Sequence, residues 1–301
     1  MKKSFTQLLD RDRIFLWLAY HGFLNHMPDD KYLRRRFQIL IGHPLDLDNP
    51  KSFNEKLQWL KLYDHRPEYT MMVDKYAVKQ YVADMIGAEH VVPTLGVWDR
   101  FDEIDFDKLP AQFVLKCTHD SGGLVICRDK SRLDVQAARK KINDCLKRNY
   151  YNYCREWPYK NVKPRVFAEQ YMEDGSSPEL IDYKFMCFDG RVRCSFVCSE
   201  RFSGEGLKVT FFDLDWNVMP FERHYPKSEK PIPKPKTYEK MLELAEKLSA
   251  GIPFVRVDFY EVHGQVYFGE LTFYPGSGME EFTPEEWDYT LGSWITLPEK
   301  T

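Results

Sequence analysis

Apolar residues recur at helical spacing in the N-terminal part of the chain, and residues 5–65 are therefore predicted to be helical. One helix is expected over residues 29–40, because Gly42 follows it and glycine favours the end of a helix. Ser52 and Glu55 have the spacing of a capping box, in which the serine accepts a backbone N–H and the glutamate reaches back. This pattern predicts a helix that starts after Ser52.

Farther along the chain, short apolar runs bounded by glycine, proline and polar residues predict β-strands. These runs occupy residues 113–117, 124–127, 166–171, 183–188, 191–198, 208–219, 254–260 and 266–271. Further helices are expected at residues 71–86, 132–149 and 237–250. Asp189-Gly190 and His263-Gly264 join two pairs of strands, and Asp-Gly supplies the positive φ values that a tight hairpin turn demands. Helices first and antiparallel hairpins later predict an α+β fold.

Composition narrows the class of protein. The chain has 301 residues, 43% of them hydrophobic and 30% charged, which is typical of a soluble globular protein with one large domain or two lobes. Its net charge of −3 argues against nucleic-acid binding, because such proteins usually carry a basic surplus. Seven scattered cysteines without a C-x-x-C pair indicate neither a disulfide framework nor a zinc site. Reduced thiols in a cytoplasmic protein are the simplest interpretation.

Residues 14–24 are mostly apolar, but the run is too short to span a bilayer and no signal-peptide cleavage site follows it. We therefore expect a buried amphipathic helix here and no transmembrane segment. A peripheral contact with a membrane or a partner protein is the alternative interpretation.

A lysine at the end of a predicted strand precedes a glycine-containing loop. Lys116 is followed by the sequence His119-Asp120-Ser121-Gly122-Gly123. Glycine lets backbone N–H groups approach phosphate oxygens, and a lysine adds a positive charge. The spacing is not that of a Walker A motif, and a lysine before a tight turn also occurs on ordinary protein surfaces.

Two carboxylates lie on the last predicted hairpin. Asp258 and Glu270 are expected to face each other across its strands, and opposed like charges destabilise a sheet unless something neutralises them. A magnesium ion can do so, because it binds carboxylates together with phosphate oxygens. An exposed acidic pair on a solvated face is the alternative.

Two further charged pairs accompany these groups. Asp182 and Lys184 are two residues apart on one strand and share a face, which also suits a structural ion pair. Lys75 and Lys79 share one face of the helix predicted over residues 71–86, as they would on an ordinary solvated helix.

In this order, the segments resemble the TupA-like ATP-grasp family, which is named for a teichuronopeptide biosynthesis protein. The resemblance covers nearly the whole chain and rests on KSFNEKLQW at residues 51–59, DKY at 74–76, VLKCTHDSGG at 114–123 and DYKF at 182–185. It implies two α+β lobes that clamp ATP, preceded by a helical region. The implied division is a helical region at residues 1–65, a first lobe with the phosphate loop at 66–167, and a second lobe with the metal site at 168–301.

The resemblance also implies a set of nucleotide-binding residues. They are Lys75, Lys116, His119, Ser121, Gly122, Gly123, Glu169, Gln170, Tyr171, Met172, Asp182 and Lys184. The two lysines Lys75 and Lys116 match contacts to phosphates, residues 119–123 match the loop that closes over the γ-phosphate, and residues 169–172 match the hinge whose backbone reads adenine. Asp182 matches the acid that binds ribose, and Lys184 matches a further basic phosphate contact.

The implied metal ligands are Asp258 and Glu270, with Thr272 as a third. The usual metal pattern is Glu-x-Asn, so Thr272 is a departure that leaves the number of metal ions open. Arg256 matches an arginine near the reacting carboxyl group in D-alanine–D-alanine ligases. Arg256, Lys116 and Lys184 are therefore the expected catalytic residues.

The implied activity is that of an ATP-dependent carboxylate–amine ligase that uses Mg²⁺, forms an acyl-phosphate and releases ADP. Its expected partners are a small-molecule carboxylate, such as a sugar acid or sugar nucleotide, and an amino acid or simple amine. The family context suggests modification of a uronic acid in a bacterial capsule or other surface polysaccharide.

Three other functions remain open at this stage. A glycosyltransferase would need a D-x-D motif, for which Asp213-Leu214-Asp215 is the only candidate. A non-catalytic nucleotide-binding protein would tolerate loss of Glu270. A carbohydrate kinase-like ATP-grasp enzyme would phosphorylate its substrate without an amine.

Overall fold

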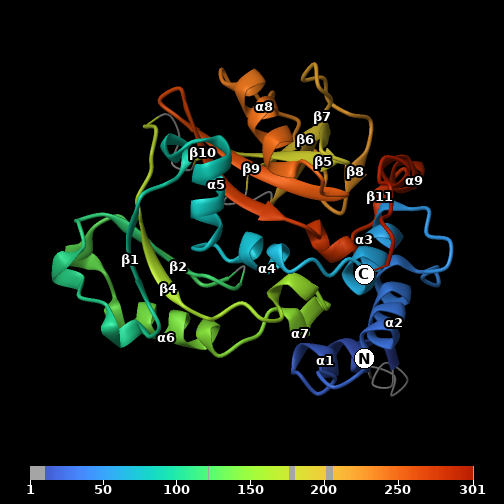
Figure 1. The fold of residues 1–301 in the computed structure, drawn as a ribbon, viewed down its shortest axis with the longest axis horizontal. Helices are drawn as coiled ribbons and strands as arrows, with labels where there is room; N and C mark the ends of the chain where they lie inside the picture. The colour runs from blue at the N-terminus through green and yellow to red at the C-terminus, as the bar shows by residue number, and fades with distance from the viewer. Residues whose placement is uncertain (1–10, 121, 176–179, 201–205, 301) are drawn as a thin grey trace, which may run out of the picture.

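The computed structural model describes residues 11–120, 122–175, 180–200 and 206–300. Its N-terminal part is helical, as the sequence predicts, with α1 (Arg11–Tyr20), α2 (Asp29–Ile41) and α3 (Phe53–Tyr63). Gly42 ends α2 in a left-handed conformation with φ 96°. Residues 5–10 of the predicted helical region lie outside the described residues. Figure 1 shows these helices on one side of the molecule, close to the C-terminus.

The capping box at the start of α3 is confirmed. The Ser52 side chain accepts from the backbone N–H of Glu55 at 3.2 Å, and Glu55 Oε2 accepts from the backbone N–H of Ser52 at 3.1 Å. Both residues are buried, so these backbone groups have no water to replace the bonds.

Replacing Ser52 with alanine is expected to lower the free energy of unfolding by about 1 kcal/mol, because one N-terminal N–H of α3 loses its acceptor. Urea denaturation would measure the loss. Ser52→Thr keeps the hydroxyl group and serves as the control. Equal stability of Ser52→Ala and the wild type would contradict the role of the cap.

The single helix predicted over residues 71–86 is wrong, because two helices occupy the segment. These are α4 (Glu68–Val73) and α5 (Val78–Ile86). Asp74 turns the chain out of the helix, and its Oδ1 accepts the backbone N–H groups of Tyr76 and Ala77, each at 2.9 Å. The backbone N–H of Lys75 instead donates to the carbonyl oxygen of Thr118 at 3.0 Å.

The first sheet has four antiparallel strands in the order β1-β4-β2-β3. They are β1 (Thr94–Trp98), β2 (Phe113–Cys117), β3 (Leu124–Cys127) and β4 (Val166–Gln170). The predicted strand at residues 113–117 and its return at 124–127 are both confirmed. The helix α6 (Val135–Leu146) packs on β2 and β3.

The second sheet has five antiparallel strands in the order β10-β9-β5-β6-β7. They are β5 (Asp182–Phe188), β6 (Arg191–Ser199), β7 (Lys208–Phe212), β9 (Phe254–Val262) and β10 (Gln265–Thr272). Both predicted hairpins are present. Asp189 and Gly190 have φ 48° and 76° in the turn between β5 and β6, as the Asp-Gly sequence predicts.

Shorter elements complete the fold. They are α7 (Tyr151–Cys154), α8 (Tyr238–Ser249), α9 (Glu286–Ser293), β8 (Glu222–Arg223), β11 (Phe282–Thr283), and the 3₁₀ turns η2 (Ala88–His90), η3 (Phe101–Glu103), η4 (Phe106–Lys108), η5 (Lys130–Arg132), η6 (Trp157–Tyr159) and η7 (Pro275–Gly278). The helix α8 covers one face of the second sheet, against β5, β6 and β9.

Two hydrophobic cores hold the fold together. The smaller one lies between the first sheet and α6. The larger one joins the second sheet, α8 and the N-terminal helices, so these helices are part of the second lobe's packing. The result is an α+β molecule with two sheets facing a common middle region (Figure 1). Among the described residues, no helix is long and apolar enough to cross a membrane.

Candidate nucleotide and metal site

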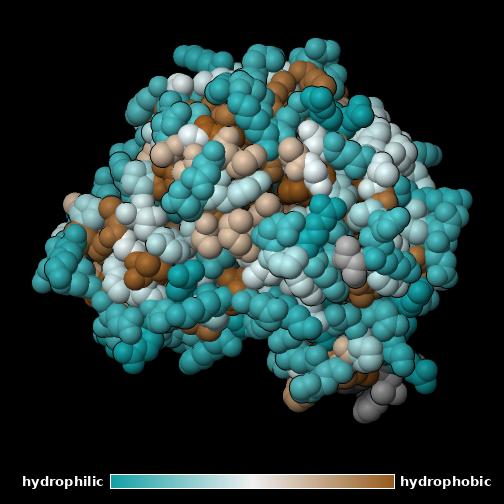
Figure 2. Space-filling model, in the orientation of Figure 1, coloured by the Kyte–Doolittle hydropathy of each residue, from teal (hydrophilic) through white to brown (hydrophobic). Residues whose placement is uncertain are grey.

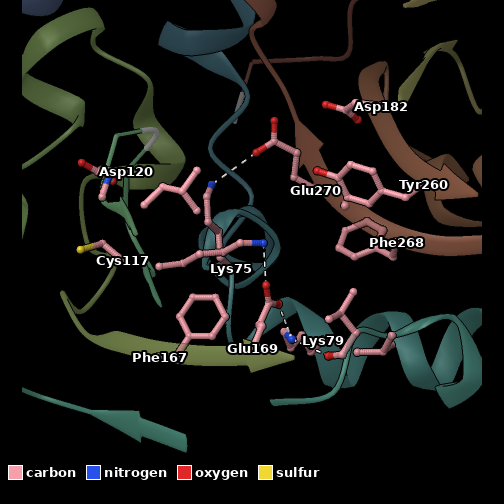
Figure 3. Close-up of a pocket in the computed structure, with 16 residues that line it drawn as sticks. Lys75, Lys79, Cys117, Asp120, Phe167, Glu169, Asp182, Tyr260, Phe268 and Glu270 are labelled. Carbon is pink, nitrogen blue, oxygen red and sulfur yellow. Dashed lines mark hydrogen bonds and ion pairs between the residues drawn. The ribbon is translucent and has the colours of Figure 1, made fainter. Parts of the chain in front are cut away.

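A cavity of about 160 Å³ lies between the two sheets. Its lining comes from three parts of the fold: Lys116, Asp120, Gly123, Phe167 and Glu169 from the first sheet and the loop after β2, Lys75 and Lys79 from the segment between α4 and α5 and from α5, and Asp182, Tyr260, Phe268 and Glu270 from the second sheet. Figure 3 shows the lysines and the acids pointing into the same space. Figure 2 shows a mainly hydrophilic face in the same orientation as Figure 1, with apolar residues gathered near its centre.

Successive side chains of each strand point to opposite faces of the first sheet, and this explains which of them reach the cavity. Leu115 and Ala168 point into the smaller core, whereas Lys116 and Phe167 point the opposite way and pair with each other in register. Glu169, two residues after Phe167, therefore lies on the cavity side as well.

Glu169 binds two lysines of the cavity. Its Oε1 lies 2.5 Å from Lys79 Nζ, and its Oε2 lies 2.5 Å from Lys116 Nζ. Burial favours the neutral carboxyl group, but the two lysines together hold the pKa of Glu169 below its ordinary value. Lys79 is a residue that the resemblance does not assign to the site, although it belongs to the same helical segment as Lys75.

Because the pKa of Glu169 is lower in the folded protein than its ordinary value of 4.5, its contribution to stability is present above that value and is lost as the pH falls through the folded pKa. Glu169→Gln is expected to cost about 3 kcal/mol at neutral pH, since it leaves two partly buried lysines without a partner. Urea unfolding of the wild type and of Glu169→Gln at decreasing pH should show that the difference between their free energies of unfolding becomes smaller in acid. Glu239→Gln, on the exposed surface of α8, is the control, and a difference independent of pH would contradict the ion-pair explanation.

On the second sheet, the acids and bases form one cross-strand row. Glu270 pairs in register with Asp258, and Asp258 pairs with Lys184. The two carboxylates thus face each other across the ladder, as the sequence predicts. A bulge at Gly269 precedes Glu270, and a Cβ there would lie 3.1 Å from the carbonyl oxygen of Asp258, so a glycine suits this position.

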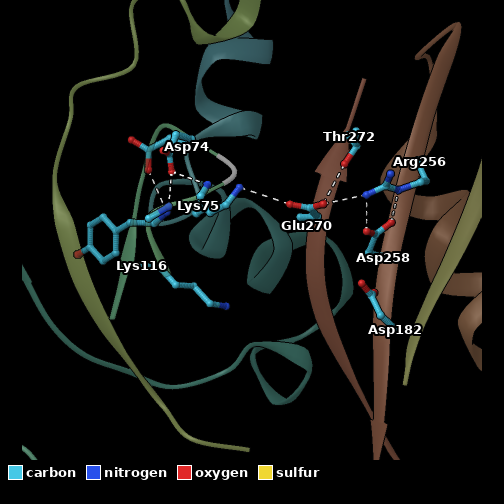
Figure 4. A network of polar contacts seen from close by, with 12 residues as sticks. Asp74, Lys75, Lys116, Asp182, Arg256, Asp258, Glu270 and Thr272 are labelled. Atoms are coloured by element: carbon cyan, nitrogen blue, oxygen red, sulfur yellow. Dashed lines mark hydrogen bonds and ion pairs between the residues drawn. The ribbon is translucent and has the colours of Figure 1, made fainter. Parts of the chain in front are cut away.

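Basic side chains neutralise this acidic pair. Arg256 Nε donates to Asp258 Oδ1 at 2.7 Å, and Arg256 Nη2 donates to Asp258 Oδ2 at 2.6 Å and Glu270 Oε1 at 2.8 Å. Lys184 Nζ donates to Asp258 Oδ2 at 2.5 Å and also binds Asp182. Lys75 Nζ lies 3.3 Å from Glu270 Oε2 (Figure 4). The opposed carboxylates therefore do not by themselves require a metal ion.

Burial and charge act against each other in this network. Burial favours the neutral form of Glu270, but Lys75, Arg256 and Lys184 hold the pKa of its carboxyl group well below the usual value. Burial likewise opposes the charged form of Lys184, yet Asp182 and Asp258 raise the pKa of its ammonium group. Burial raises the pKa of Asp258, and Arg256 and Lys184 oppose that shift.

The donor set at this row fits a hard cation. Asp258 Oδ1 and Glu270 Oε2 each accept a single bond, so each keeps a lone pair that a magnesium ion could use. Thr272 Oγ1 lies 3.2 Å from Glu270 Oε1, where it supports the carboxylate. Glu270 is 35% exposed at its side chain and Asp258 only 1%, so Glu270 is the accessible acid and Asp258 lies behind it.

Not every residue expected from the sequence lies at the cavity. His119 is buried, with Nε2 3.2 Å from the carbonyl oxygen of Cys145 and 3.1 Å from that of Arg148. Gln170 and Met172 line a neighbouring depression together with Pro93 and Tyr267. Gly122 donates its backbone N–H to Asp120 Oδ1 at 3.1 Å. Ser121 lies outside the described residues. Tyr171 lines neither the cavity nor the neighbouring depression.

Residues 55–296 match the family described as TupA-like ATPgrasp. The chain belongs to this family. The ATP-grasp protein described here has no match among curated proteins.

Among solved structures, similar ones include D-alanine–D-alanine ligase from Bacillus anthracis complexed with ATP, at 15% identity and TM-score 0.38, with 67% of this chain and 54% of that chain covered. D-alanine–D-alanine ligase from Helicobacter pylori has 15% identity and TM-score 0.41, and the match covers 82% of this chain and 70% of that chain. ATP-grasp ligase PsnB complexed with minimal precursor has 9% identity and TM-score 0.38, and the match covers 69% of this chain and 55% of that chain. The chain thus spans little more than half the length of the Bacillus anthracis ligase and of PsnB. Similarities this distant carry no argument about activity.

Proposed function

We propose that this ATP-grasp protein is a magnesium-dependent carboxylate–amine ligase that couples ATP cleavage to amide formation. The observation that supports it most directly is the cavity between the sheets, which Lys75, Lys79 and Lys116 line together with Asp182 and Glu270. Three ammonium groups suit a polyphosphate, and an acid pair beside them suits its metal ion.

In this proposal, Lys75 and Lys116 hold the phosphates, and the backbone of Gly123 approaches them closely because no side chain intervenes. Asp182 binds the ribose, and the segment 169–172 binds the adenine. Lys184 holds Asp182 and Asp258 in place and adds positive charge beside the phosphates.

The acids Asp258 and Glu270, with Thr272, would hold magnesium, which supplies charge compensation to phosphate oxygens when it is bound. Arg256 is placed to orient a substrate carboxylate, because its guanidinium group lies between the two acids. The carboxylate oxygen attacks the γ-phosphorus and ADP leaves. An amine then attacks the acyl carbon, so that an amide forms and phosphate leaves. Each fixed positive group that stabilises the transferring phosphoryl group can be worth about 3–4 kcal/mol.

We further propose that the carboxylate belongs to a uronic acid of a bacterial surface polysaccharide or its sugar-nucleotide precursor, and that the reaction takes place in the cytoplasm. Family membership supports the polysaccharide context. The candidate D-x-D motif of a glycosyltransferase has a structural explanation, since Asp213 Oδ1 accepts the backbone N–H groups of Asp215 at 3.0 Å and Asn217 at 2.8 Å. This turn follows β7 and does not line the cavity.

The decisive experiment measures ADP release with Mg·ATP across a matrix of uronic acids and amines. ADP release that depends on both substrates, with an amide detected by mass spectrometry, is the expected result. Release without an amine, accompanied by a phosphorylated sugar, would favour a kinase. Turnover of a sugar nucleotide without ATP would favour a glycosyltransferase. No ADP release from any pairing would count against the ligase.

A further inference from the structure

Three side chains of types that can ligate a metal ion converge at the phosphate loop, which comprises residues 119–123. Cys117 ends β2, Asp120 lies in the loop, and Cys145 lies in the last turn of α6. The two Sγ atoms and a carboxylate oxygen all lie within 4.8 Å of one another, and all three residues are buried. The sequence did not indicate this cluster, because its cysteines come from separate elements and not from a C-x-x-C pair.

The loop backbone packs directly on the two sulfur atoms. A Cβ at Gly123 would lie 2.5 Å from the Sγ atom of Cys117 and 2.5 Å from that of Cys145. The Gly123 backbone N–H donates to Asp120 Oδ1 at 2.9 Å, and its carbonyl oxygen accepts from the N–H of Cys117 at 2.8 Å. The cluster and the phosphate loop are therefore one packed unit.

The acid of the cluster, Asp120, is buried. Within the part of the chain that the structure describes, no lysine or arginine forms an ion pair with Asp120, although only 7% of this residue is exposed. The Cys117 thiol, burial and Asp120 all raise the pKa of Cys145. Without a cation, these effects favour the neutral thiol of Cys145. A bound metal ion reverses that preference, because it stabilises thiolates.

The hydrogen bonds of a histidine beside the cluster suit the tautomer that a metal ligand has. The Nε2–H of His119 can donate to the carbonyl oxygens of Cys145 and Arg148, which leaves Nδ1 with a lone pair. This Nδ1 is buried and has no hydrogen-bond partner among the residues that the structure describes. Histidine ligands of metals usually donate the other ring N–H in this way. Nδ1 lies outside the set of three converging atoms, but it belongs to the residue next to Asp120.

We propose that Cys117, Asp120 and Cys145 form a second metal site, for a thiophilic divalent cation of the zinc class, distinct from the magnesium site on the second sheet. Two thiolates and a carboxylate suit Zn²⁺ and disfavour Mg²⁺, which prefers oxygen ligands only. Binding would release the two thiol protons to solvent. The ion would tie the phosphate loop to the end of α6 and so fix the shape of the loop.

The test uses Co²⁺ as a spectroscopic probe for this site in the full-length protein, under anaerobic conditions. Titration should produce the near-ultraviolet band that marks Co²⁺–thiolate bonds, and the band should saturate at one equivalent of Co²⁺. Zn²⁺ should displace Co²⁺ and abolish the band, whereas millimolar Mg²⁺ should not. Cys145→Ala is expected to weaken Co²⁺ binding at least about 100-fold, because it removes a direct ligand. Cys127→Ala, which removes a buried thiol of the same lobe outside the cluster, should bind Co²⁺ as the wild type does.

Thermal unfolding provides a second readout. Zn²⁺ should raise the melting temperature of the wild type and of Cys127→Ala, but not that of Cys145→Ala. Absence of the thiolate band in the wild-type protein would overturn the proposal and leave a cluster that only packs the loop against α6. An unchanged band in Cys145→Ala would overturn it as well. If Cys145→Ala does not fold, Asp120→Asn is measured in its place, with the same expected loss and the same overturning result.

Discussion

Asp258→Asn is expected to abolish ADP formation and to lower the free energy of unfolding by about 3–5 kcal/mol. The side chain of Asp258 is 1% exposed and binds Lys184 and Arg256, whose side chains are only 8% and 10% exposed. The amide removes the charge that both cations need, so two buried positive groups lose their main partner. Urea denaturation measures the stability and a coupled ADP assay measures the activity.

The matched control for this variant is Asp215→Asn. It makes the same chemical change on the exposed turn after β7, and it should leave both quantities unchanged within about 0.5 kcal/mol. Full stability of Asp258→Asn would show that Lys184 and Arg256 do not depend on this carboxylate. Full activity would remove Asp258 from the proposed metal site.

Glu270→Gln should separate activity from stability. The Glu270 side chain is 35% exposed and can be rehydrated, so the loss of stability should be smaller than for Asp258→Asn. The amide is a poor ligand for magnesium, and we expect ADP formation to fall by about 10³-fold, or about 4 kcal/mol in transition-state stabilisation.

The assay for Glu270→Gln compares kcat and the magnesium concentration at half-maximal rate with those of the wild type. Excess Mg²⁺ should recover little of the rate if the carboxylate is a direct ligand. Glu239→Gln on α8 is the control for loss of one negative charge. An unchanged rate for Glu270→Gln would remove Glu270 from the proposed metal site.

Local sequence signals predicted the fold well wherever short-range chemistry decides the structure. The capping box of Ser52 and Glu55 and the hairpin turn at Asp189 depend on neighbours in the chain, and both are confirmed. The opposed positions of Asp258 and Glu270 follow from strand pairing around one short turn.

Long-range contacts explain what the sequence did not show. The helix predicted over residues 71–86 breaks at Asp74 because the next backbone N–H pairs with Thr118 of the first lobe, a partner that helical periodicity does not reveal. His119 appeared in a phosphate-loop motif, yet carbonyl oxygens of α6 and the segment after it hold its ring away from the cavity. The pairing of Cys117 with Cys145 likewise depends on how α6 packs on the sheet.

Lys75 contacts both Thr118 beside the first sheet and Glu270 on the second sheet, and in the proposed function this contact couples the binding of ATP to the binding of magnesium. Its backbone is tied to the first lobe at Thr118, while its ammonium group occupies the Glu270 oxygen that has no other donor. A phosphate that attracts Lys75 frees this oxygen for a cation, and a cation on Glu270 frees Lys75 for a phosphate. Each ligand should therefore raise the affinity for the other by the same factor, so nucleotide binding and metal loading become thermodynamically reciprocal.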